Sequence, residues 1–155
     1  MSRVYSIEFD GVAVSAAVDF FEVVPAANKP FVVHAIYLSQ SSDVGDAAEE
    51  ILRVRLISGH TTTGSGGAAA TPRPLDVVDA AAGATAATNN TTIASVGTAI
   101  NLHSDTFNIR TGWVYIPTPE TRPRISVTDS RLVIRLMAAP ADALTMSGTI
   151  YIEEL

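Results

Sequence analysis

The sequence contains no cysteine and a single lysine, Lys29. Without cysteine, neither a disulfide framework nor a thiolate zinc site can form. Nine of the ten cationic residues are therefore arginines, and the formal net charge at pH 7 is −6. No basic stretch is interleaved with aromatic residues, so we expect no nucleic-acid partner held through phosphate contacts.

Charge is scarce, and long apolar runs are missing. Charged residues make up 17% of the chain, against about 25% in typical globular domains. No stretch approaches the ~20 apolar residues of a membrane helix, and polar residues interrupt the N-terminal "MSRVYSIEFDGVAVS", which is unlike a signal peptide. We expect no membrane partner, synthesis and retention in the cytoplasm unless the protein leaves inside an assembly, and a low-charge surface that suits contact with neighbouring proteins.

What the sequence has instead is alternation with a period of two. Tyr5, Ile7 and Phe9 fall on one side of their segment and polar residues on the other, as in a half-buried strand. Turn signals recur every 8–15 residues, and 155 residues fit one domain. The pattern predicts a single all-β domain over residues 1–155, an antiparallel β-sandwich that is jelly-roll-like. Strands are expected near 4–10, 19–24, 31–39, 51–58, 99–109, 131–137 and 147–153.

One segment, residues 59–92, does not alternate. It is rich in Gly, Ala and Thr, and its only charged residues are Arg73, Asp76 and Asp79. This composition predicts one long loop inserted into the sandwich, and loops on a rigid scaffold commonly carry contacts. The assembly contacts predicted within it are Thr63, Gly64, Gly66, Gly67, Pro72, Arg73 and Pro74.

Four arginines alternate with apolar residues on two predicted strands, at 51–58 and 131–137. Because alternate residues point to opposite faces, these arginines are expected on the polar faces, either solvated or paired with carboxylates. The arginines are Arg53, Arg55, Arg131 and Arg135, and their candidate partners are Glu8, Asp10, Glu153 and Glu154.

No catalytic signature is visible. His34 lies in the most apolar segment, which favours a packed or hydrogen-bonded core role. His103, Ser104 and Asp105 are consecutive, so strand geometry would send neighbours to opposite faces instead of gathering a hydrolytic triad. The G-x-S-x-G motif is also missing. We therefore predict no enzymatic activity, no catalytic residue and no cofactor.

An acidic cluster is formed by Asp43, Asp46, Glu49 and Glu50. Its spacing does not match an EF-hand loop. The favoured interpretation is a solvated segment in which Asp46 caps a short helical turn, with Glu49 as its capping-box partner; a cation site is the alternative. No metal ligand is predicted.

Three stretches resemble a small family found in the virion-structure modules of tailed phages: "YLSQSSDVGDAAEEILR" (37–53), "SGHTTTGSGGAAATPRPLD" (58–76) and "RLVIRLMAAPADALTMSGTIYIEEL" (131–155). The resemblance implies a structural virion protein, most plainly a head decoration (cement) protein. It would form a homo-oligomer, a trimer, on the major capsid protein and stabilise the outer head surface. It implies no active site.

The alternative is a carbohydrate- or receptor-binding sandwich of a phage tail or fibre. In that case Trp113, Tyr115 and Tyr151 would form a platform for sugar stacking. Core packing is the commoner role of sparse aromatic residues on strands.

Overall fold

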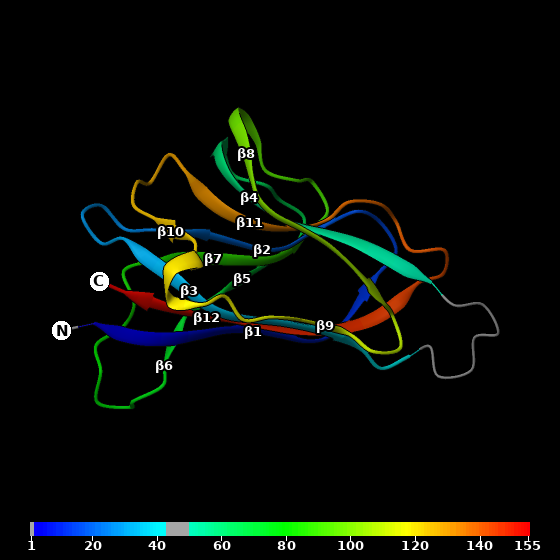
Figure 1. Ribbon diagram of the computed structural model, residues 1–155, viewed down its shortest axis with the longest axis horizontal. Helices are drawn as coiled ribbons and strands as arrows, with labels where there is room; N and C mark the ends of the chain where they lie inside the picture. The colour runs from blue at the N-terminus through cyan, green and yellow to red at the C-terminus, as the bar shows by residue number, and fades with distance from the viewer. Residues whose placement is uncertain (1, 43–49) are drawn as a thin grey trace.

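The computed structural model describes residues 2–42 and 50–155 and shows two antiparallel sheets packed face to face (Figure 1). The prediction of an all-β sandwich is confirmed. The elements are β1 (Arg3–Val14), β2 (Asp19–Val24), β3 (Phe31–Gln40), β4 (Ile51–Thr62), β5 (Ala68–Ala70), β6 (Arg73–Pro74), β7 (Thr85–Asn90), β8 (Ser95–Asn108), β9 (Trp113–Tyr115), a 3₁₀ turn (Pro119–Thr121), β10 (Arg124–Ile125), β11 (Arg131–Leu136) and β12 (Leu144–Glu154).

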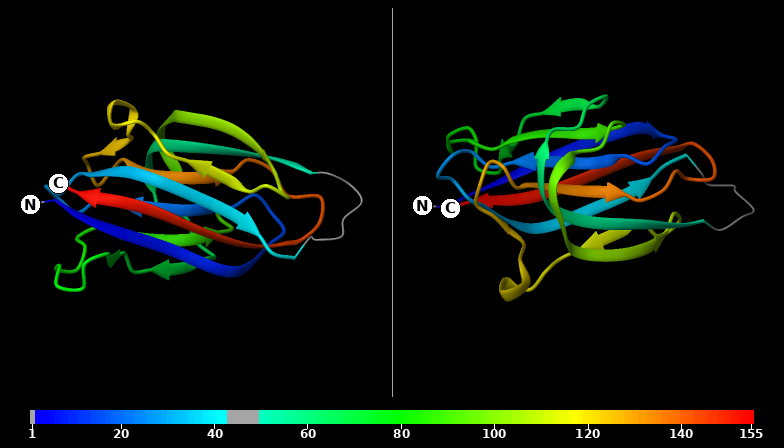
Figure 2. Two further views of the ribbon diagram at one scale, coloured as in Figure 1. Left: turned by 60° about the horizontal axis from the view of Figure 1, so that its bottom comes forward. Right: turned by 90° about the horizontal axis from the view of Figure 1, so that it is seen from above.

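The strand order is that of a jelly roll with an insertion. One sheet runs β10-β3-β12-β1-β6, with β9 also paired to β3, and the other runs β5-β7-β2-β11-β4-β8. Each sheet therefore contains a jelly-roll set of four strands, β1-β12-β3-β9 in the first and β2-β11-β4-β8 in the second. Figure 2 shows the two layers from two further directions.

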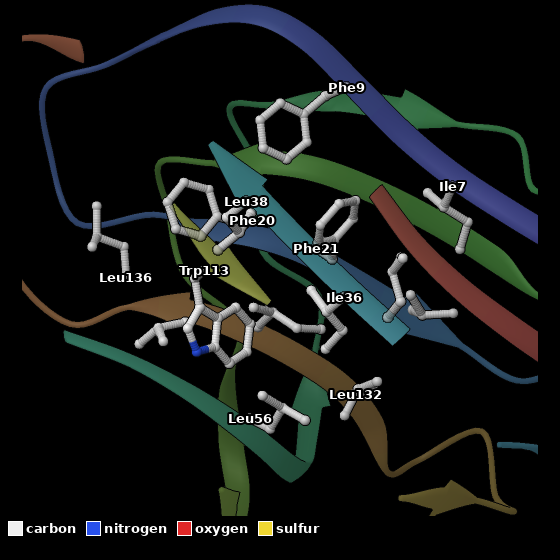
Figure 3. Close-up of a cluster of buried hydrophobic side chains, with 14 of the residues drawn as sticks. Ile7, Phe9, Phe20, Phe21, Ile36, Leu38, Leu56, Trp113, Leu132 and Leu136 are labelled. Carbon is white, nitrogen blue, oxygen red and sulfur yellow. The ribbon is translucent and has the colours of Figure 1, made fainter. Parts of the chain in front are cut away.

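The core lies between the sheets and is built from the inward faces of both (Figure 3). Phe9 of β1 stacks on Phe20 of β2, with ring centroids 6.0 Å apart, and packs against Phe21 at 5.3 Å. Leu132 and Leu136 of β11 reach the same cluster and are fully buried. The predicted alternation of β1 and β11 thus supplies the packed face of each sheet.

The segment predicted as one long loop, residues 59–92, is folded in large part. β4 continues to Thr62, and β5, β6 and β7 lie within the segment. β7 pairs with β2 from Asp19↔Asn90 to Val24↔Thr85, and β5 pairs with β7, so the insertion widens the second sheet. These strands could not be recognised from the sequence, because Ala and Thr differ too little in hydrophobicity to mark one face as buried and the other as exposed.

The arginine prediction was wrong for β11. Arg131 is 6% exposed and Arg135 is 8% exposed, and they pair with Glu22 and Asp19 of β2 instead of the terminal carboxylates. The face of the sheet that carries them is covered by the chain itself, so a polar face did not mean a solvated face.

Two smaller expectations can be followed in the described residues. His34 is only partly buried, and its Nε2 lies 2.6 Å from Oε2 of Glu153, so it is hydrogen-bonded as predicted but not packed into the core. The expected helical cap at Asp46 lies outside the described residues, as do Asp43 and Glu49. Within residues 2–42 and 50–155, no helix is long and apolar enough to cross a membrane.

Candidate assembly surface

A buried ionic network holds residues 60–67, here called the cover segment, against the outer face of the second sheet. Arg135 donates two hydrogen bonds to Asp19, from Nε to Oδ1 at 2.6 Å and from Nη2 to Oδ2 at 3.2 Å. Arg131 donates from Nη1 to Glu22 Oε1 at 3.0 Å and from Nε to the carbonyl of His60 at 3.1 Å. Buried charges are tolerated only when paired and hydrogen-bonded, and both conditions are met here.

The first four predicted contact residues belong to this cover segment. The Thr63 hydroxyl accepts a hydrogen bond from Arg131, and the Gly64 amide donates to Glu22 Oε2 at 3.0 Å. The Gly67 amide donates to the side chain of Asn90 at 3.2 Å. These residues therefore have intramolecular roles, and the prediction that they also contact a neighbour stays a prediction.

Gly66 shows why the cover segment is rich in glycine. Its φ is +87°, and a Cβ at this position would lie 2.2 Å from the hydroxyl oxygen of Thr91. A side chain would therefore be both strained and obstructed. Gly64 and Gly67 allow backbone to pack on backbone, because a Cβ there would lie 2.4 Å from the Thr92 carbonyl oxygen and 2.0 Å from that of Thr88.

The other three predicted contact residues lie at a sheet edge. Arg73 and Pro74 form β6, which pairs with Tyr5 and Ser6 of β1. Pro72 is buried and Arg73 is exposed. Of the seven predicted contacts, Arg73 is thus the charged side chain that a neighbour could reach.

The sequence did not single out the longest exposed strand, β8. In the described part of the chain β8 has β4 as its only neighbour, so its other edge is unpaired. Most of its residues are exposed, including the apolar Val96, Ile100 and Leu102. An unpaired edge of this length is a template for another strand. The mixture of small, polar and apolar residues in β8 gave no such signal.

Two arginines of β4 stand beside that edge. Arg53 and Arg55 are opposite Thr106 and Ser104 of β8, and together they line a hollow of about 270 Å³. Neither guanidinium group has a hydrogen-bonded or ionic partner among the described residues. The sequence placed these two correctly, on the polar face of their strand.

On the opposite face of β8, aromatic rings close the sandwich. Trp113 Nε1 donates to Asp105 Oδ2 at 3.0 Å, and the ring of His103 lies 4.6 Å from that of Tyr115. The Trp113 hydrogen bond, helped by the Thr106 amide, holds the pKa of Asp105 below its usual range. Burial raises the pKa of Tyr115.

This cluster does not assemble the groups that the alternative functions need. Trp113 is 4% exposed, so its ring is not open to a sugar. His103 Nε2 lies 3.5 Å from Asp105 Oδ2, at ion-pair distance without a formed hydrogen bond. Ser104 lies on the other face of β8, beside Arg55, so the three consecutive residues do not converge.

Residues 2–42 and 50–155 contain no group of three or more His, Asp or Glu side chains placed to hold a metal ion. Glu50, the described member of the acidic cluster, accepts a hydrogen bond from the Ala141 amide at 2.5 Å.

Comparisons with known proteins give no assignment: no family model matches the chain, and neither a curated protein nor a solved structure matches it.

Proposed function

We propose that this protein is a structural component of a tailed-phage virion, a decoration protein that binds the outer surface of the head and stabilises it. The observation that carries the proposal is the long unpaired edge of β8 on a jelly-roll sandwich. Jelly rolls recur in viral capsid domains, and an open edge offers backbone groups to a neighbouring chain. The resemblance of the stretches 37–53, 58–76 and 131–155 to a virion family points the same way.

In this proposal the copies associate side to side as a homotrimer and dock on the major capsid protein. A specific interface removes roughly 1,200–2,000 Å² from water, and its centre is apolar. Exposed apolar side chains are available on both sides of the β8–β9 end of the sandwich. Val114 and Ile116 are 58% and 64% exposed, and Ile100 is 53% exposed.

The buried ionic network supports the proposal because it makes the contact surface rigid. Arg131 ties β11 and β2 to the cover segment, and Arg135 ties them to the carbonyl of Ala94 just before β8, so the face behind β8 is preorganised. A rigid contact surface loses little conformational entropy on binding, which suits a shell built from many weak contacts.

Two measurements test the proposal. Sedimentation velocity of the purified chain at micromolar concentration should show a trimer, and the chain should co-sediment with purified heads of the phage that encodes it. A monomer that fails to bind heads would contradict the decoration role. Binding to isolated tails or fibres instead would favour the carbohydrate- or receptor-binding alternative.

A further inference from the structure

The β8 edge and the two arginines beside it form one continuous surface. Arg53 is opposite Thr106, and Arg55 is opposite Ser104. These four residues, together with Val54 and Asp105, line a hollow of about 270 Å³. Two cations spaced two residues apart therefore lie one strand in from an unpaired backbone edge.

We propose that this surface binds an extended acidic segment of a partner protein, added to β8 as a further strand. This inference names the chemistry of the partner in the decoration role proposed above, and it rests on that role. An added strand would lie about 4.8 Å from β8 and about 9.6 Å from β4. Carboxylates at alternate residues of that strand are about 6.6–6.8 Å apart along it, which matches the spacing of Arg53 and Arg55.

We infer an acidic partner because the guanidinium groups of Arg53 and Arg55 have no carboxylate partner among the described residues. Asp105 also lines the hollow. Its carboxylate accepts a hydrogen bond from Trp113 on the opposite face of β8, and among the described residues it forms its ion pair with His103 and none with Arg53 or Arg55. Arginine pairs with carboxylates through two parallel hydrogen bonds. Ser104 and Thr106, whose hydroxyl groups can donate hydrogen bonds, line the same hollow.

A second copy of β8 is a poorer occupant. The strand Ser95–Asn108 carries one acidic residue, Asp105, whose carboxylate is already hydrogen-bonded. Antiparallel pairing of two β8 edges would therefore satisfy backbone groups but leave Arg53 and Arg55 of both copies without partners. Only a segment that brings its own carboxylates completes the site.

The probe for the test is an acetylated and amidated octapeptide in which glutamate alternates with threonine, titrated into the full chain. The affinity is measured by fluorescence anisotropy, and the site is located from the amide resonances of β8. We expect binding that perturbs β8 and weakens with added salt. The Arg53→Gln/Arg55→Gln double variant should bind about tenfold more weakly, as expected for two partly exposed charge pairs.

Three controls test separately the peptide's charge, its backbone pairing with the β8 edge, and the location of the binding arginines. Replacing every glutamate of the peptide by glutamine should weaken binding to a similar extent. N-methylation of alternate amides should abolish it, because the peptide then cannot pair with the edge. Arg124→Gln removes an exposed arginine from β10, in the other sheet, and should leave the affinity unchanged.

The inference is overturned if the glutamine peptide binds as tightly as the acidic one, or if the N-methylated peptide does. It is also overturned if β8 proves to pair with a second β8 in sedimentation and amide-exchange experiments while the double variant behaves as the wild type. If the chain binds heads and the acidic peptide does not bind β8, the inference fails alone. If the peptide binds as expected and the chain does not bind heads, the decoration role fails alone.

Discussion

At the residue scale, Arg135 and Asp19 form a charged pair that is buried and held by two hydrogen bonds. Asp19 is fully buried, and its two carboxylate oxygens accept from Arg135 and from the Ala94 amide. Removing one partner would leave an unpaired charge in the interior, whereas removing both would not. Such pairs are costly to break but add little beyond what apolar packing would give.

We therefore expect Arg135→Met to lower the free energy of unfolding by about 3–5 kcal/mol. The double variant Asp19→Leu/Arg135→Met should lose much less than the sum of the two single changes. Urea denaturation of the four proteins measures the coupling. A single variant within 1 kcal/mol of the wild type would contradict a buried, desolvated pair.

Val96 adopts a left-handed conformation, with φ of +59°, which is rare for a β-branched residue. Its side chain is 65% exposed, so little packing compensates for the strain. Val96→Asn should raise the stability by about 1 kcal/mol, because Asn tolerates this conformation. Val127→Asn is the control, since Val127 is similarly exposed at 57% and has no positive φ. Equal effects of the two changes in thermal unfolding would rule out the strain argument.

The pKa of Asp105 is lowered chiefly by the hydrogen bond from Trp113. Because the pKa of Asp105 is lower in the folded state than in the unfolded chain, its carboxylate stabilises the fold at pH values above the ordinary pKa of 3.8. That stabilisation is lost as the pH falls through the lowered pKa of the folded state. Trp113→Phe should raise the pKa of Asp105 toward 3.8, as followed by NMR titration of the carboxyl carbon. An unchanged pKa would show that the indole is not the cause.

At the element scale, residues 59–92 contain two parts that pack differently. The cover segment and β7 are bonded to the second sheet, whereas the turn around Val77 and Val78 projects from it, with these side chains 92% and 84% exposed. The first piece is part of the folded unit, and the second is a surface turn.

Deleting residues 63–70 should therefore destabilise the domain instead of sparing it, because the deletion removes β5 and the Gly64 donor to Glu22. The matched control is deletion of Val77 and Val78, which should change the melting temperature little. Circular dichroism during thermal unfolding measures both. A stable domain after the first deletion would mean that residues 63–70 are dispensable for folding.

At the scale of the whole molecule, protection should follow the sheet order. β11 lies between β2 and β4, and β12 lies between β3 and β1, so these strands are bonded on both sides. Within residues 2–42 and 50–155, β8 pairs with β4 alone. Amide hydrogen exchange should be slowest in β11 and β12 and markedly faster along the free edge of β8. Slow exchange throughout β8 in a dilute monomer would show that its edge is already covered.

Much of the architecture could be predicted from the sequence. Alternation in the segments of β1, β4 and β11 identified strands and their core faces, because a period of two survives wherever large apolar and charged residues alternate. The expected strands also lay near β2, β3, β8 and β12. The candidate surface was only half visible: Arg53 and Arg55 were placed on an open face, but the free edge of β8 was not foreseen, since edge position depends on which strands pair.

The sequence alone thus determined the fold class, the core-facing residues of the alternating strands, and the exclusion of disulfides and thiolate metal sites. Tertiary structure alone decided that Arg131 and Arg135 are buried while Arg53 and Arg55 are open, although all four alternate with apolar residues in the same way. The physical reason is that alternation assigns a side chain to a face of its own strand. Whether water or another part of the chain covers that face is settled only when distant parts of the chain, here residues 60–67 and Ala94, pack on it and accept hydrogen bonds from the two guanidinium groups.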